Sequence, residues 1–266
     1  MEICKICGTE THKVFNAKIL FKYDIDYFQC RNCEFVQTEK EYWLEEAYQN
    51  SMNLTDTGIM HRNQRFSKIT ASIIILFFDK KLKFLDYAGG YGVFTRIMRD
   101  IGFDFYWNDP YTINALARGF EQEEGIKYHA VTTFESFEHF MDPTKEVEKI
   151  LQLTDNIIFS TAMVPKPLPQ IDKWWYYGAE HGQHIALYSK KALNILAKKF
   201  DMHYYNLDNM HIFSKKKINP LGAMVLKFKY SKYLLYASYF LFYPFLKSRT
   251  ADDMNRLKHG PSQLPQ

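Results

Sequence analysis

The chain has 266 residues, a hydrophobic content of 47% and a formal net charge of +4. This length suits one doubly wound domain plus a small appendage, and the apolar content is sufficient for a core. The charge is small and the lysines and arginines are spread out, which argues against a nucleic-acid-binding protein. Aromatic residues reach 17%, which fits either large core side chains or stacking on a sugar or base.

All four cysteines lie near the start of the chain, in two C-x-x-C pairs: Cys4 with Cys7, and Cys30 with Cys33. Two such pairs supply the four thiolates that tetrahedral Zn²⁺ prefers, and a metal would hold together a segment too small for its own core. Four sulfur ligands leave no open position, so a structural role is expected. Disulfides and a rubredoxin-like iron centre are the alternatives, and no secretory signal precedes the cysteines to favour disulfides. Residues 1–40 are predicted to form a zinc ribbon that serves as a scaffold or substrate-side lid.

Residues 41–80 are expected to lead into the main domain through a helix at 61–78, whose apolar end is too short to span a bilayer. The following pattern alternates between strand and helix. Strands are predicted at 83–87, 103–108, 128–134, 156–161, 202–208 and 223–229, and helices at 91–101, 113–120, 143–152 and 189–200. This alternation predicts an α/β domain over residues 81–230, with a mostly parallel sheet and helices on both faces. Ligands bind at the carboxyl ends of such strands, where Asp86, Asp109, Glu135 and Thr161 fall.

Residues 84–92, F-L-D-Y-A-G-G-Y-G, read as an apolar strand that ends in a carboxylate and a glycine-rich turn. Small residues there let the backbone approach a cofactor closely. A dinucleotide fingerprint would need a glycine or alanine where Thr95 stands, and Asp86 would repel a pyrophosphate. S-adenosylmethionine (SAM) carries a cationic sulfonium and α-amino group, which suit Asp86. Asp109, at the end of the next strand, is placed to accept hydrogen bonds from ribose hydroxyls, as it would with either cofactor.

Asp86 through Gly92, followed by Asp109, resembles motifs I and II of class I SAM-dependent methyltransferases. Residues 134–143 and 156–165 resemble later segments of the same family, and the similarity covers roughly residues 60–215. It implies a Rossmann-like fold and SAM as cofactor, with these contacts: Asp86, Ala88, Gly89, Gly90, Gly92, Asp109, Pro110, Phe134 and Glu135. Ala88 replaces the first glycine of the family's D-x-G-x-G-x-G. The short spacing from Asp109 to Phe134 leaves little room for the usual third strand, so no adenine contact is assigned.

Residues 174–189, W-W-Y-Y-G-A-E-H-G-Q-H-I-A-L-Y-S, combine an acid, two imidazoles and aromatic rings. Methyl transfer to oxygen or carbon usually needs a base, and histidine titrates in the right range. His181 or His184 is therefore the candidate base, and Glu180 would orient it or share its role. A backbone-bonded loop histidine is the alternative for His184.

Two further groups in these stretches have both a functional and a structural interpretation. Glu138 could touch cofactor or substrate, whereas His139 could simply cap or pack the following helix. Trp174 and Trp175 suit either ring stacking or core packing.

Residues 174–189 also resemble a segment of the sugar C-methyltransferases of deoxysugar pathways. Those enzymes carry a four-cysteine zinc module and a downstream Glu-His pair, and the pair here would be Glu180 and His181. More generally the chain is similar to methyltransferases found with surface-polysaccharide genes. The resemblance implies a cytoplasmic enzyme with a small-molecule acceptor, sugar or nucleotide-sugar derived, although the long C-terminal domain of those enzymes is missing. A nicotinamide-dependent α/β oxidoreductase and a non-catalytic zinc-containing assembly protein are the alternatives.

Residues 231–266 are expected to form an aromatic helix and a flexible tail. The helix is interrupted by Pro244 and too short to span a bilayer. It is expected to pack on the domain, with a peripheral membrane or dimer contact through residues 231–247 as the alternative. The tail after Lys258 is expected to be disordered.

Overall fold

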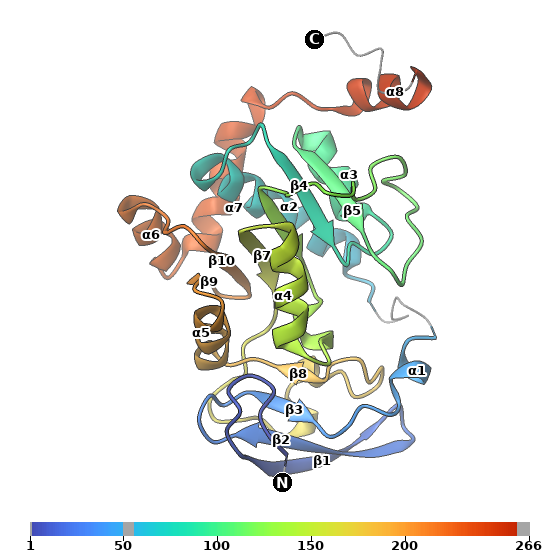
Figure 1. Ribbon diagram of the computed structural model, residues 1–266, viewed down its shortest axis with the longest axis vertical. Coiled ribbons are helices and arrows are strands. Elements are labelled where there is room, and N and C mark those ends of the chain that lie inside the picture. Colours follow the sequence, from blue (N-terminus) through green and yellow to red (C-terminus); the bar gives the residue numbers. More distant parts are fainter. Residues whose placement is uncertain (1, 50–55, 260–266) are drawn as a thin grey trace. The chain divides into compact units, whose positions relative to one another are not determined.

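The computed structural model describes residues 2–49 and 56–259, and its contacts divide the chain into two units (Figure 1). The first unit comprises residues 1–53, 133–152 and 156–217, and the second comprises residues 54–132, 153–155 and 218–266. A four-stranded sheet contains β1 (Thr11–Ile19), β2 (Tyr23–Cys30), β3 (Val36–Thr38) and β8 (Ala186–Leu187), in that order.

A six-stranded sheet carries the α/β part of the fold. Its order is β5 (Asp104–Asn108), β4 (Lys83–Tyr87), β6 (Ala130–Thr133), β7 (Asn156–Ser160), β10 (Met210–Ser214) and β9 (His203–Leu207). Helices alternate with the strands of this sheet along the chain, which confirms the predicted Rossmann-like class. The sheet is mixed, however, because β10 runs antiparallel to both β7 and β9.

In the second unit, β4 pairs in parallel with β5 and with β6. The strand β4 is buried from Phe84 to Asp86, and it ends at the glycine turn that starts α3 (Val93–Ile101). Gly102 ends this helix with a positive φ of 126°, where a side chain would meet the backbone of Lys247. The long helix α2 (Ile59–Phe77) packs on α3 and begins close to its predicted start.

In the first unit, α4 (Pro143–Leu153) and α5 (Lys190–Lys199) match the predicted helices closely. The Ser189 hydroxyl caps α5 by accepting a hydrogen bond from the Ala192 backbone N–H. The strands β9 and β10 form a hairpin whose turn includes Asp208 at φ 71°. The short elements are α1 (Leu44–Ala47), η1 (Phe137–His139), η2 (Ile171–Lys173) and η3 (Trp175–Tyr177).

Two predicted elements are wrong. The expected strand at 223–229 lies mostly within α6 (Pro220–Lys227), which starts with an Asn219 cap and a proline at its first turn. The expected helix at 113–120 is irregular, because the Asn114 side chain accepts the Ala117 N–H and bonds Glu121 instead of leaving the backbone to a helix.

The C-terminal part of the second unit forms two helices joined by a 3₁₀ turn. The aromatic helix α7 (Ser231–Phe242) packs on α2, where the Ser72 hydroxyl donates to the Leu235 carbonyl at 2.7 Å. It is followed by η4 (Tyr243–Phe245) and α8 (Thr250–His259). Residues 260–266, most of the tail expected to be disordered, lie outside the described residues.

A buried ion-pair network fixes α8. Arg99 is fully buried and donates through Nη2 and Nε to the two oxygens of Asp253, at 2.6 and 2.8 Å. Its guanidinium also bonds Asp104 at 2.8 Å and lies over the Phe120 ring at 3.6 Å. This network holds α8 just before the tail that the sequence predicted to begin after Lys258, in a stretch for which no separate helix was predicted.

Several apolar side chains of the C-terminal helices are exposed, among them Tyr233, Phe240, Leu241 and Phe245. The expected membrane or dimer contact through residues 231–247 stays a prediction. Among the described residues, no helix combines the length and apolar character needed to cross a membrane.

Candidate functional site

Asp86 lies at the end of β4 and is almost completely buried. Its two carboxylate oxygens accept hydrogen bonds from the hydroxyls of Thr95, at 3.1 Å, and Thr132, at 3.0 Å. Burial raises the pKa of Asp86 to about 7, although the two hydroxyls partly oppose this rise. A buried carboxylate of this kind favours a cationic ligand, because a nearby positive charge would stabilise its ionised form.

The glycine turn after Asp86 is held in a strained, close-packed conformation. Ala88 adopts a φ of 56°, in the left-handed region that glycine enters most easily. A side chain on Gly89 would lie 2.7 Å from the Asp86 carboxylate and 2.8 Å from the Trp107 ring. Gly90 faces open space. The turn therefore brings bare backbone up to Asp86 and leaves room beside Gly90.

The turn leads directly into α3, whose first residue follows Gly92. Gly92 has a φ of 81° and provides no side-chain cap. The backbone N–H groups at the start of this helix therefore receive no cap from Gly92, and the Thr95 N–H is directed toward the Asp86 carboxylate.

Asp109 ties the turn to the loop after β5. One of its oxygens accepts the Gly90 N–H at 2.9 Å, and the other accepts the N–H groups of Tyr111 and Thr112 at 2.8 and 3.1 Å. A carboxylate oxygen has more than one acceptor site, so the oxygen that holds Gly90 can accept a further hydrogen bond. Pro110, the next residue, is exposed. Asp109 is thus partly engaged in shaping the loop itself.

Glu135 follows β6 and has a φ of 50°. Its N–H donates to the Ser160 hydroxyl at 2.8 Å, and this hydroxyl donates back to the Glu135 carboxylate at 2.6 Å. Phe134, beside it, is half-buried. Strain at a strand end often accompanies a functional site, and the reciprocal bonds hold Glu135 in place.

A second buried carboxylate, Glu138, lies in η1 among histidines. Its side chain is 0% exposed, and within residues 2–49 and 56–259 neither oxygen has a hydrogen-bond partner. Burial, with the negative charge of Glu135 as a second cause, raises the pKa of Glu138 to about 8. His139 and His184 lie against it, with one ligand atom of each of the three residues within 4.8 Å of the others.

The histidines of this cluster are held in defined orientations. His184 Nδ1 lies 2.6 Å from the Tyr176 carbonyl oxygen, so Nδ1 carries the donated hydrogen and Nε2 keeps its lone pair. His139 Nδ1 lies 2.8 Å from the Tyr48 hydroxyl. Burial lowers the pKa of His139 to about 3, and it also lowers that of His184, so both are neutral imidazoles.

His181 belongs to the same loop, with its ring centroid 4.7 Å from that of His184. Its Nδ1 lies 3.2 Å from the Gln183 backbone nitrogen. Glu180 is exposed and makes no hydrogen bond or ion pair with any described residue. The structure therefore brings the two candidate histidines together, and the buried acid beside them is Glu138.

The four cysteine sulfurs converge, with all four ligand atoms within 4.8 Å of one another. The closest sulfur pairs, Cys4 with Cys33 and Cys7 with Cys30, are each 3.4 Å apart, far beyond the ~2.05 Å of a disulfide. Backbone N–H groups also point at the sulfurs of Cys4 and Cys30. Four convergent thiols with N–H donors around them fit a tetrahedral metal site.

The sheet of the four-cysteine module also holds the histidine loop. Its last strand, β8, lies within residues 174–189 and pairs with β3. The Trp43 indole donates to the Gly182 carbonyl at 2.8 Å, and the Ser189 hydroxyl donates to the Cys33 carbonyl at 2.5 Å. The module is therefore bonded to this loop, and its expected role as a scaffold or substrate-side lid stays a prediction.

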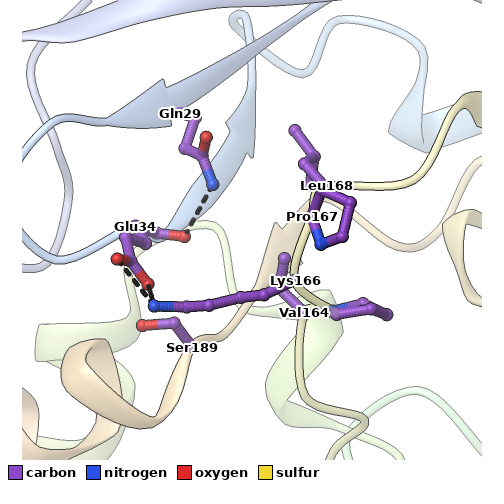
Figure 2. Close-up of a pocket in the computed structure, with 8 residues that line it drawn as sticks. Gln29, Glu34, Val164, Lys166, Pro167, Leu168 and Ser189 are labelled. Atoms are coloured by element: carbon purple, nitrogen blue, oxygen red, sulfur yellow. Dashed lines mark hydrogen bonds and ion pairs between the residues drawn. The ribbon is translucent and has the colours of Figure 1, made fainter.

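A separate hollow of about 240 Å³ lies beside the four-cysteine module (Figure 2). Figure 2 shows Lys166 reaching across it to Glu34, with an ion-pair distance of 2.6 Å. None of the candidate catalytic or cofactor residues lines this hollow. Its lining residues are Gln29, Glu34, Val164, Pro165, Lys166, Pro167, Leu168 and Ser189.

Comparison with known proteins decides the family. Residues 60–206, more than half of the chain, match the family model described as a methyltransferase domain. The chain belongs to this methyltransferase family. It is therefore an enzyme, a SAM-dependent methyltransferase, and neither the nicotinamide-dependent oxidoreductase nor the non-catalytic assembly protein is supported.

Solved structures give weak similarities to this methyltransferase. A magnesium protoporphyrin IX methyltransferase from Synechocystis PCC 6803 with bound S-adenosylhomocysteine has a TM-score of 0.44 at 14% identity, covering 64% of this chain and 90% of that one. A possible histamine N-methyltransferase from Thermotoga maritima has a TM-score of 0.44 at 12% identity, covering 60% and 92%. A comparison with curated protein sequences gives no match. The family assignment rests on the match over residues 60–206.

Sequence reasoning gave too little weight to Glu138 and to the pairing of β8 with the cysteine module. Glu138 lies in a segment with family resemblance, but the absence of a hydrogen-bond partner for its carboxylate among the described residues depends on packing from distant parts of the chain. No sequence signal reports a two-residue strand such as β8.

Proposed function

We propose that the methyltransferase transfers the methyl group of SAM to a small-molecule acceptor derived from a sugar or nucleotide sugar. The observation that carries the cofactor half of this proposal is the buried Asp86 at the head of a glycine turn. Its carboxylate suits the cationic α-amino and sulfonium groups of SAM, and the exposed backbone of the turn suits close approach.

The remaining cofactor contacts are assigned to the two loops beside this turn and to the strand end after β6. The Asp109 oxygen that accepts the Gly90 N–H has a second lone pair, and this lone pair would accept a hydrogen bond from a ribose hydroxyl. Ala88, Gly89 and Gly92 would supply backbone, and Pro110, Phe134 and Glu135 would line the cofactor. Glu135 follows closely after Thr132, whose hydroxyl bonds Asp86.

The base is assigned to His181, with Glu180 beside it in sequence and His184 as the second imidazole. The rings of His181 and His184 lie 4.7 Å apart on a loop that the four-cysteine module holds. Trp175, which is 79% exposed on the same loop, offers a surface on which a sugar ring can stack. A structural Zn²⁺ in the four-cysteine site would keep this loop folded.

The experiment combines cofactor binding with methyl transfer. The protein is incubated with methyl-labelled SAM and a panel of nucleotide sugars and free sugars, and labelled products are identified by mass spectrometry. We expect transfer to a sugar hydroxyl or carbon. Label found only on peptide or nucleic acid would contradict the proposed acceptor.

Variants then separate binding from catalysis. His181→Ala is expected to keep S-adenosylhomocysteine affinity and to lose turnover by about 10²-fold or more, as removal of a general base does. Glu180→Ala tests whether the carboxylate of Glu180 orients the histidine base or shares its role. Unchanged turnover in His181→Ala would refute the base assignment and leave the cofactor site standing.

A further inference from the structure

Glu138, His139 and His184 form a second cluster of potential metal ligands, distinct from the four cysteines. One ligand atom from each residue lies within 4.8 Å of the others. The cluster combines one carboxylate oxygen with two imidazole nitrogens, whereas the first cluster contains only sulfur. The two sets therefore differ in the cations that they prefer.

The carboxylate of Glu138 points to a missing partner. It is completely buried, and in the part of the chain that the structure describes neither oxygen makes a hydrogen bond of normal geometry, although the hydroxyls of Tyr176 and Thr161 face the carboxylate. Burying an unsatisfied carboxylate is costly unless a proton or a cation compensates it. Glu135 adds a second negative charge nearby and increases the attraction for a cation.

The histidines are oriented as metal ligands usually are. The Tyr176 carbonyl fixes the tautomer of His184 and leaves the Nε2 lone pair available, and the Tyr48 hydroxyl contacts His139 at Nδ1. Outer contacts of this kind commonly set the ring orientation and basicity of metal-bound histidines.

From this arrangement we propose that Glu138, His139 and His184 bind a divalent transition-metal ion. The mixed oxygen and nitrogen set suits Mn²⁺, Fe²⁺, Co²⁺ or Zn²⁺ better than the softer cations that thiolates select. Three protein ligands leave coordination positions open, and these would take an oxygen of the acceptor. This role for the metal rests on the proposed function, whereas metal binding itself does not. In the metal-bound enzyme His184 is a ligand, which leaves His181 as the base.

The test uses the full-length protein with Zn²⁺ in the four-cysteine site, after weakly bound metal has been removed by brief dialysis against EDTA. Mn²⁺ is titrated in, and free Mn²⁺ is followed by electron paramagnetic resonance. We expect one Mn²⁺ per chain, because the cysteine site holds Zn²⁺ and disfavours Mn²⁺. Glu138→Gln should weaken Mn²⁺ binding by more than about tenfold.

Glu148→Gln is the matched control, since Glu148 is an exposed carboxylate on the neighbouring helix α4. His184→Asn provides a second ligand variant, and circular dichroism shows whether each variant is folded. Co²⁺ should give a spectrum without the thiolate charge-transfer bands of a cysteine site. Equal Mn²⁺ uptake by wild type and folded Glu138→Gln, or no uptake by wild type, would overturn the proposal.

S-adenosylhomocysteine binding is measured on the same samples by calorimetry. Mn²⁺ binding without S-adenosylhomocysteine binding would remove the proposed function and keep the metal site. The reverse result would remove only the metal site.

Discussion

Replacing Asp86 with asparagine should make the methyltransferase more stable and less able to bind its cofactor. The pKa of Asp86 is raised from an ordinary value of 3.8 to about 7 by burial. Between these two pH values the folded chain holds a proton that the unfolded chain has lost. Stability therefore falls as pH rises from about 4 to about 7 and levels off above that range. The shift corresponds to about 4 kcal/mol.

Asparagine has no charge to bury, and its amide can still bond the hydroxyls of Thr95 and Thr132. Urea unfolding should therefore show Asp86→Asn more stable than wild type at pH 8, by up to about 4 kcal/mol, and similar to it near pH 4. Asp252→Asn, an exposed carboxylate in α8, controls for net charge. Equal stability differences at both pH values would refute the reasoning.

The same ionisation should control cofactor affinity. A cationic ligand favours the ionised carboxylate, so the affinity of wild type for S-adenosylhomocysteine should rise about tenfold from pH 6 to pH 8. Asp86→Asn should bind weakly and without this pH dependence, as measured by calorimetry.

Two further predictions concern the ends of the chain. Asp253→Ala should lower the free energy of unfolding by about 3–5 kcal/mol, because it leaves the buried Arg99 guanidinium without its main partner, whereas Asp252→Ala should change it by no more than about 0.5 kcal/mol. A urea titration checks both, and equal effects would contradict the ion-pair account. Chelation of the metal or Cys33→Ser should speed hydrogen exchange in β1 to β3 and also around Gly182, since the cysteine module holds that loop. Unchanged protection at Gly182 would show that the loop is held by other contacts.

The sequence predicts correctly the strands and helices whose ends are marked by glycine, proline or capping residues. The strand at 83–87 has the same bounds in the structure, because an apolar run ends abruptly in a glycine turn. The helices at 143–152 and 189–200 were found within about a residue because their termini carry Pro143 and the Ser189 cap. The cysteine spacing likewise predicted convergent sulfurs.

The errors occurred where local patterns are ambiguous. The short apolar run from Leu221 to Leu226 suits a strand or a helix equally, and the Asn219 cap with Pro220 is the signal that distinguishes them. The hairpin from β9 to β10 makes the sheet mixed, which alternation alone cannot predict. The environment of Glu138 depends on residues distant in sequence, such as Tyr176 and His184, so its burial could not be read from its neighbours.

The central claim is that the turn after Asp86 binds SAM. Isothermal titration of S-adenosylhomocysteine into the purified protein at pH 8 tests it most directly, with Asp86→Asn measured alongside. The account predicts one site per chain in wild type and a large loss of affinity in the variant. Saturable binding that is unchanged by Asp86→Asn, or no binding to the folded wild-type protein, would contradict it.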